Sequence, residues 1–444
     1  MEENMKFEIE QIDEYLISCS GLSLVGMILP RTNLIKRLNK MPLPHVKNPQ
    51  VSNSDCVISY LGLLCQGKSD FDHIEAFRDD QFFQISLGLD RVPSSPTLRQ
   101  RLDMAGDLWN PIIMEESARI LKIAGAEITP CIRDLVPLDI DVSPFDNSHT
   151  KKEGVSRTYK GHDGYAPIFA YLGQEGYCIN AELHEGKDHS QKNTVEFLGK
   201  SIRYARMITA RSLLVRMDSG FDSLDNIKQM LQKETKADFI IKRNLRKESP
   251  EAWLAIAKQH GMCCLEREGK NVYMGAIEII REGLSLRTVF KVVERTIKAN
   301  GQILLTPEIE VETYWTSLSD PAYKIIELYH EHGLSEQFHS EIKSDLDLER
   351  LPSGKFATNN LVLHLGVMAY NILRLIGQES LKKPDAPLKK KAQRRRIRTV
   401  IQNLITLASR LVHHARKYRL GFGRHSPWFC TFKRIHQAFA VLNP

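Results

Sequence analysis

The sequence predicts a mixed α/β fold, in which helices flank a mixed sheet and a β-rich unit is inserted into the chain. Two observations carry this prediction. Two apolar runs, 166–172 and 177–183, flank the turn-forming segment Gly173–Gly176, and strand-like and helical patterns then alternate from 190 to 242. A hairpin followed by alternating helices and strands is typical of a mixed sheet with helices on its faces.

The N-terminal half provides the first elements. Residues 1–130 are predicted to be mostly helical, and Ser95, with Pro96 in the following turn, has the features of a helix start. Residues 131–242 would form the first part of the sheet. Its predicted elements are a strand at 137–142, a polar loop at 143–162, the hairpin, a helix at 190–207, a strand ending at Asp218, a helix at 222–234 and a strand at 238–242.

The second half begins with residues 243–322, which break the alternation and are predicted to form a β-rich insertion. A turn signal, Ala299-Asn300-Gly301, separates two strand-like runs, and a further strand is predicted at 311–318. Residues 323–380 are predicted to return to the α/β unit. Residues 381–444 are predicted to form a basic, helical C-terminal region, because helical spacing relates Ile397, Val400, Ile401, Leu404, Leu407, Leu411 and Ala415.

Charge is distributed unevenly along the chain. The net charge is +7, but Lys382–Pro444 carries sixteen Lys and Arg against one acid and is +15, so the remainder is −8. Such a segment predicts a polyanionic partner, although a solubilising tail would have the same composition. Its helical spacing favours a folded surface that contacts nucleic acid. Candidate contacts are Arg394, Arg395 and Arg398, whereas Arg99 and Arg101 would touch DNA or lie on an ordinary surface.

The sequence argues against a membrane-spanning or exported protein and against a structural zinc site. No stretch approaches the roughly 18 consecutive apolar residues of a membrane span, and Met1–Met5 lacks the pattern of an export signal. The eight cysteines include no C-x-x-C pair, which predicts free thiols and argues against structural zinc. We therefore expect a cytoplasmic protein with no membrane partner.

Four polar residues share one predicted helix face. Tyr329, His332, Glu336 and Lys343 fall within about 60° of one another at about 100° per residue. The opposite face carries apolar residues at a four-residue step, which suits a core: Leu334, Phe338, Ile342 and Leu346. A solvated surface would also explain a polar stripe, so its meaning depends on the carboxylates found elsewhere.

Two predicted strands end in aspartates, Asp141 and Asp218. Together with Glu336 on the helix, they can build a site for divalent metal ions of the kind that cleaves phosphodiesters. Oxygen ligands favour Mg²⁺ or Mn²⁺ over zinc. Alternatively, each strand-end aspartate has a turn or cap role. Asp139 points in the same direction as Asp141 and is an alternative first ligand.

The motifs around these carboxylates support a specific resemblance. Asp141-Val142-Ser143 matches D-x-[ST], Asp218-Ser219-Gly220-Phe221 matches D-x-G-F, and the helix matches the spacing Y-x2-R-x3-E-x6-K, with His332 in place of arginine. Over residues 90–440 the chain resembles bacterial insertion-sequence transposases of the DDE type. One branch also has phrases similar to Lys152-Glu-Gly-Val-Ser, Tyr159-Lys-Gly-His and Gly164-Tyr-Ala-Pro-Ile.

This resemblance implies both a fold and a function. The core would be RNase H-like, with a five-stranded mixed sheet, between a helical DNA-binding region at 1–130 and a basic DNA-binding region at 381–444. Asp141, Asp218 and Glu336 would be catalytic and hold two Mg²⁺ or Mn²⁺ ions. Tyr329, His332 and Lys343 would contact DNA. Trp315, on the insertion, would stack on a flipped base or pack in the insertion's own core.

The implied activity is cleavage at the ends of the protein's own insertion sequence, followed by joining of those ends to target DNA. Terminal inverted repeats and target DNA would be the partners, bound by a homodimer in a synaptic complex associated with the bacterial nucleoid. Two alternatives remain: a non-catalytic repressor derived from a transposase, and a structure-specific nuclease with the same core. Metal-dependent nicking of DNA that contains the ends would separate the three.

Overall fold

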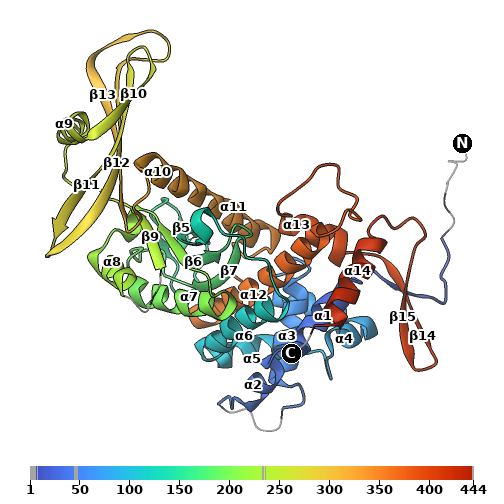
Figure 1. Ribbon diagram of the computed structural model, residues 1–444. Helices are drawn as coiled ribbons and strands as arrows, with labels where there is room; N and C mark the ends of the chain where they lie inside the picture. Colours follow the sequence, from blue (N-terminus) through green and yellow to red (C-terminus); the bar gives the residue numbers. More distant parts are fainter. Residues whose placement is uncertain (1–6, 8, 45–48, 233–234, 236, 443–444) are drawn as a thin grey trace, which may run out of the picture.

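A computed structural model describes residues 7, 9–44, 49–232, 235 and 237–442, so the predicted features at Met1–Met5 and 233–234 lie outside it. Its centre is a nine-stranded mixed sheet with the order β10-β11-β12-β13-β9-β8-β2-β6-β7. Helices pack against the β9–β7 half of this sheet, while the β10–β13 half extends away from the body (Figure 1). The predicted mixed α/β class is confirmed.

The body of the sheet has the predicted order of elements. It consists of β2 (Val136–Val142), β6 (Ile168–Leu172), β7 (Tyr177–Glu182), α7 (Thr194–Ile208), β8 (Leu213–Met217), α8 (Leu224–Leu231) and β9 (Ala237–Lys242). β8 runs parallel to β2 and β9, whereas β6 is antiparallel to β2 and β7. Residues 143–162 were predicted to be a polar loop with no strands. This region and the residues just after it instead form a small sheet of β3 (Phe145–Asp146), β4 (Ser156–Arg157) and β5 (Asp163–Tyr165).

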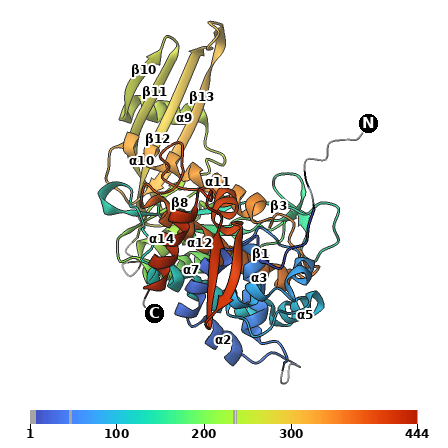
Figure 2. The same cartoon turned by 90° about the vertical axis from the view of Figure 1, so that its right-hand side faces the viewer.

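The insertion forms a long arm that is continuous with the body (Figure 2). It consists of α9 (Pro250–His260), β10 (Gly261–Arg267), β11 (Lys270–Arg281), β12 (Leu284–Ile297) and β13 (Ile303–Thr316). The predicted hairpin is confirmed, since Ile297 pairs with Ile303. The strand expected at 311–318 is the end of β13, where Trp315 pairs with Ile241 of β9. The sequence did not reveal β10, β11 or α9.

The N-terminal region is mostly helical, as predicted, apart from β1 (Tyr15–Ile17). Its α-helices are α1 (Leu22–Ile28), α2 (Leu34–Lys40), α3 (Asn53–Leu64), α4 (Gln81–Leu87), α5 (Ser95–Ala105) and α6 (Asn110–Ile123). Helix α5 begins where expected, capped by Ser94. Of these helices, α3, α5 and α6 pack against α12 (Phe356–Leu381), which is long and apolar enough to span a membrane by composition. Most of that apolar stretch is buried inside the protein, so α12 is a core helix.

The residues around Glu336 form one helical run with changes of pitch. It comprises α10 (Ala322–His330), a 3₁₀ turn (Glu331–Leu334), α11 (Ser335–Ser340) and a π-helical turn (Glu341–Asp345). Three of the four predicted core residues, Phe338, Ile342 and Leu346, are buried. Leu334 is 43% exposed, because the 3₁₀ turn rotates it away from the body.

The C-terminal region was predicted to be helical, but it is only partly so. Helix α13 (Ile397–Val400) and a π-helical turn (Ile401–Ile405) end the helical run, and a hairpin follows, formed by β14 (Ser409–His414) and β15 (Lys417–Phe422). β14 pairs with β1, so the two ends of the chain share a sheet. Helix α14 (Phe429–Ala440) completes the region. All eight cysteines are described and free, as predicted.

Candidate active site

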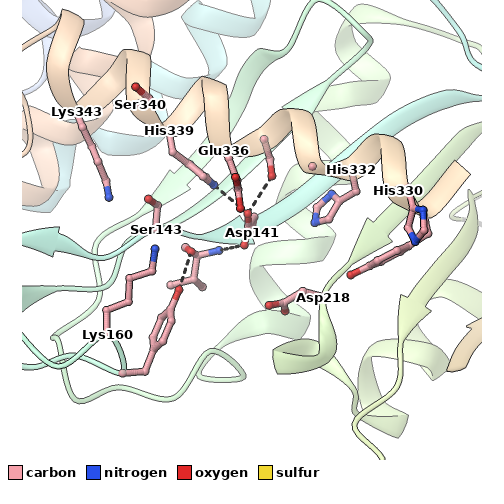
Figure 3. A pocket seen from close by; sticks show the side chains of 15 residues that line it. Asp141, Ser143, Lys160, Asp218, His330, His332, Glu336, His339, Ser340 and Lys343 are labelled. Carbon is pink, nitrogen blue, oxygen red and sulfur yellow. Dashed lines mark hydrogen bonds and ion pairs between the residues drawn. The ribbon is translucent and has the colours of Figure 1, made fainter. Parts of the chain in front are cut away.

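Three elements bring the predicted carboxylates to one pocket of about 660 Å³. The parallel register of β2 and β8 pairs Ile140 with Met217. The residues that follow them, Asp141 and Asp218, therefore lie at the same edge of the sheet. Glu336 enters from α11. Figure 3 shows Asp141 facing the helical run, with Asp218 across the pocket.

Asp141 is held by hydrogen bonds from both sides. Its Oδ2 accepts hydrogen bonds from Ser335 Oγ at 2.9 Å and His339 Nε2 at 3.1 Å, and its Oδ1 accepts one from the Val142 amide at 2.8 Å. Burial raises the pKa of Asp141, but the hydrogen bonds and the nearby histidines outweigh it and hold the pKa at about 2. Asp141 is therefore a carboxylate throughout the physiological pH range.

Asp218 has a different environment. Its Oδ1 caps the short turn Ser219–Phe221 by accepting a hydrogen bond from the Gly220 amide at 2.9 Å. Its pKa is raised by burial and by the negative charge of Asp141. Burial is the larger cause, and the second is repulsion between the two carboxylates across the pocket, which a cation would relieve.

Asp139, the alternative first ligand, is committed to a buried ion pair. Arg216 Nε lies 2.6 Å from Asp139 Oδ1, and Arg216 also donates to Oδ2 at 2.8 Å and to the Leu328 carbonyl at 2.7 Å. His332 Nδ1 lies 3.1 Å from Asp139 Oδ1. Burial lowers the pKa of His332, but the charge of Asp139 outweighs burial and raises it overall. Asp141 lines the pocket, whereas Asp139 lies beneath it and ties β2 and β8 to α10.

The donor set suits a hard divalent cation, because Asp141, Asp218 and Glu336 present oxygen atoms to a common space. Glu336 is exposed on its helix. Within the part of the chain that the structure describes, no three Asp, Glu, His or Cys side chains are grouped closely enough to hold an ion. Binding would therefore require the three carboxylates to draw together.

The remaining residues of the polar stripe also line the pocket. The ring of Tyr329 packs on Tyr314, with centroids 4.8 Å apart. His332 is buried beside Asp139. Lys343 Nζ donates to the Pro144 carbonyl at 2.6 Å, and burial lowers its pKa. The four predicted residues therefore do share one side of the helical run, but only some of their side chains face solvent.

Two predicted DNA contacts are not supported by the structure. Trp315 is 2% exposed, its Nε1 donates to Asp222 Oδ1 at 2.8 Å, and Arg243 lies 4.3 Å from its ring centroid. No face of the indole is open to a base. Trp315 packs in the main core, where β13 pairs with β9, and not in the insertion's own core as the alternative expected. Arg395 is 4% exposed and stacks over Trp428 at 4.3 Å, which removes it from the surface.

The other two arginines lie nearer the solvent. Arg394 donates to Gln337 Oε1 at 2.6 Å, beside the helix that carries Glu336. Arg398 is exposed and lies 3.3 Å from Asp345. Both guanidinium groups are therefore placed where a DNA phosphate could compete with their present partners, Gln337 and Asp345.

Sequence reasoning missed several lining residues, including His339, Ser335, Tyr159 and Lys160. A signal existed for His339, because it lies three residues after Glu336 and therefore near the same helix face. The phrase Tyr159-Lys-Gly-His was noted only as part of a family resemblance, because the position of Tyr159 and Lys160 at the pocket depends on how the chain folds between 143 and 165.

Acidic side chains at the ends of two parallel strands and on one helix place this α/β protein among those that can hold divalent metal ions at a sheet edge. The chain is a member of the transposase DDE domain group 1 family, whose model matches residues 3–444. It is therefore a DDE transposase by family, and this family comprises metal-dependent enzymes of DNA cleavage and strand transfer.

No curated protein matches the chain. Among solved structures, it is similar to a piggyBac transposase in a cryo-EM synaptic complex with hairpin DNA, at 12% identity and a TM-score of 0.42. That similarity covers 96% of this chain and 86% of the other.

Proposed function

We propose that this transposase cleaves DNA at the ends of its own insertion sequence and joins those ends to target DNA. The observation that carries the proposal is the convergence of Asp141, Asp218 and Glu336, from three separate elements, on one pocket. These are the residues that would hold the metal, with two Mg²⁺ or Mn²⁺ ions as the expected complement. When bound, such ions supply charge stabilisation to the phosphate and lower the pKa of water.

The protein's own groups would prepare this pocket for a phosphodiester. Ser335 and His339 orient Asp141 and keep it ionised. The Asp139–Arg216 pair fixes the strand ends against α10. Lys160 and Lys343 lie on the side of the pocket away from Asp218 (Figure 3), where their positive charges would attract the DNA backbone.

Both chemical steps would use this one pocket. Water would first cleave the bond at an end and leave a 3′-hydroxyl, which would then attack a phosphate of the target in line. Terminal inverted repeats and target DNA are the proposed partners, held together by a homodimer in a synaptic complex. The proposed location is the cytoplasm of a bacterium, at its nucleoid. The helix with His332 in place of arginine would be a variant of the Y-x2-R-x3-E-x6-K signature.

DNA affinity would come mainly from the basic C-terminal region rather than from the carboxylates. The β14–β15 hairpin exposes Arg410, Arg416, Lys417 and Arg419. A β-ribbon of this kind can lie against a DNA backbone or enter a groove.

The test is a nicking assay on duplex DNA that carries the inverted repeats bracketing the gene, in Mg²⁺ and in EDTA. We expect Glu336→Gln to abolish nicking and to leave end binding largely unchanged, because affinity depends on basic side chains. Glu327→Gln, an exposed glutamate of α10, is the matched control and should nick normally. Specific end binding by the wild type without any metal-dependent nicking would favour a repressor. Nicking governed by DNA shape rather than by the repeats would favour a structure-specific nuclease.

A further inference from the structure

The hairpin of β4 and β5 places two side chains at the pocket by means of a tight turn. The Gly161 amide donates to the Thr158 carbonyl at 3.0 Å, and the Thr158 amide donates to the His162 carbonyl at 2.9 Å. Gly161 has φ +83°, a conformation that favours glycine. Tyr159 and Lys160 are the two central residues of this turn, so their direction is set by the backbone.

The base of the hairpin is firmly attached to the body. Tyr165 forms a β-bridge with Glu185, and its hydroxyl donates to the Glu153 carbonyl at 2.8 Å. Gly186 packs so closely that an added Cβ would lie 2.0 Å from the Ser156 carbonyl oxygen. The turn is therefore held as a rigid projection rather than a loose loop.

Tyr159 stands between two pockets. The first is the carboxylate pocket, and the second, here called the flanking pocket, has a volume of about 540 Å³. Val142, Tyr159 and Asp218 line both. The remaining wall of the flanking pocket is formed by the segments 186–190 and 219–220, together with Arg157 and Thr158. A strand that enters one pocket and leaves by the other must pass Tyr159.

Tyr159 is 70% exposed, so its aromatic side chain is open to solvent beside the carboxylate pocket. Its hydroxyl lies 3.4 Å from the Val142 carbonyl, so the ring is tethered next to Asp141. Base–aromatic stacking tolerates any sequence, because every base has a π-face. Trp315, the aromatic expected from the sequence to stack on DNA, is buried elsewhere.

The charges of the flanking pocket are compatible with a nucleic acid strand. Arg157 and Lys187 lie on its wall, each in an exposed ion pair, with Asp163 at 3.6 Å and Glu185 at 3.0 Å respectively. Exposed pairs of this kind are weak and can exchange for a phosphate. The acidic Asp188 is already paired with Lys192 at 2.7 Å.

We propose that the flanking pocket binds the nucleotide next to the cleaved phosphate, with Tyr159 stacked on its base and Lys160 on its backbone. This subsite rests on the proposed function, since it assumes that an end of the element occupies the carboxylate pocket. It adds a positioning role for a hairpin turn that belongs to none of the three elements that carry the carboxylates. Stacking would hold the strand so that the scissile phosphate faces Asp141 and Asp218.

The test places 2-aminopurine next to the cleavage position in a duplex of the bracketing inverted repeat. Stacking on Tyr159 quenches its fluorescence, which is recorded with the full-length protein in Ca²⁺, and nicking is then measured in Mg²⁺. Tyr159→Leu should abolish the quenching and slow nicking by about tenfold or more, as expected when one stacking interaction is removed. Tyr159→Phe should retain both, because it keeps the ring. Tyr323→Leu, an exposed tyrosine of α10, is the control and should behave as wild type.

The outcomes separate the subsite from the function on which it rests. If the wild type nicks and Tyr159→Leu still quenches normally, the subsite is wrong. A Phe variant as impaired as the Leu variant would also overturn it, since the hydroxyl rather than the ring would then matter. If the wild type quenches but never nicks, the proposed activity fails while the stacking subsite stands. Lys160→Ala should raise KM more than it lowers kcat, and Lys160→Arg should restore KM.

Discussion

The Nε2 atom of His339 lies 3.1 Å from the Oδ2 atom of Asp141, so a helix side chain holds the carboxylate at the end of β2. The other ring nitrogen, Nδ1, lies 3.0 Å from the Tyr171 hydroxyl, which fixes the orientation of the imidazole. We expect His339→Ala to raise the pKa of Asp141 from about 2 toward its ordinary value of 3.8. The acidic limb of the pH–rate profile should move to higher pH in the variant.

The same hydrogen bond contributes to stability, with a defined pH dependence. Because the folded-state pKa of Asp141 is depressed, its contribution is fully present above about pH 4 and disappears as pH falls toward 2. Urea unfolding of the metal-free protein should show His339→Ala destabilised by about 1.5–3 kcal/mol at pH 7, and by less at pH 3. Tyr171→Phe is the control, since it leaves the bond to Asp141 in place. A deficit that does not change with pH would show that His339 acts only by packing.

Asp139 and Asp141 should have separable roles despite their shared direction on β2. Asp139→Ala leaves Arg216 and His332 buried without their carboxylate, which should cost about 3–5 kcal/mol of unfolding free energy. Asp141→Ala should leave a folded protein that binds ends but does not nick them. Urea unfolding and nicking, measured on both variants, check this. A stable but inactive Asp139→Ala beside an active Asp141→Ala would reverse the assignment.

The sequence was sufficient for the order of strands and helices in the body, because apolar periodicity and the Gly173–Gly176 turn are local signals. It failed in the C-terminal region, where Leu407, Leu411 and Ala415 fit helical spacing although the chain turns back at Ala415 and Arg416. These two residues have φ +50° and +61°. Neither is Gly, Asn or Asp, so the usual mark of a two-residue hairpin turn is missing.

In the candidate site, too, some features could be predicted from local sequence and others depend on tertiary structure. The meeting of the three carboxylates at one pocket could be predicted, because strand ends and one helix face have sequence signatures. Local sequence favoured Asp141 over Asp139 through the Val142-Ser143 that follows it. The reason why Asp139 is withdrawn from the pocket was not visible there, because it is Arg216, which β8 places directly opposite Asp139. The pairing of Trp315 with Asp222 is likewise a tertiary interaction with no local trace.

The β14–β15 hairpin allows a sharper test of DNA binding than removal of the C-terminal region. That region pairs with β1 and buries Ile397, Val400 and Ile435, so its truncation would expose the core. Replacing Arg416, Lys417 and Arg419 with alanine should instead weaken DNA binding. The slope of log affinity against log salt should decrease by about 0.9 for each phosphate that the variant no longer neutralises. Alanine at the exposed Lys228, Lys247 and Lys298, outside both expected DNA-binding regions, gives the same change in charge as a control. If both triple variants have the same slope, the hairpin is not a DNA-binding surface.

Trp315 provides the last prediction, and it concerns how the insertion is joined to the body. The residue lies where β13 pairs with β9, with its indole N–H bonded to Asp222 and its ring covered by Arg243. Trp315→Ala should destabilise the protein by about 3–5 kcal/mol, because it leaves a large cavity and removes the donor to Asp222 Oδ1, although Asp222 Oδ2 keeps its bond from the Asn244 amide. Trp315→Phe keeps most of the packing and should be destabilised less. Because the ring is buried, nicking and strand joining should slow by the same factor in any variant that still folds. Normal nicking with a selective loss of joining, in a variant of unchanged stability, would instead show that the tryptophan leaves its pocket to act on DNA.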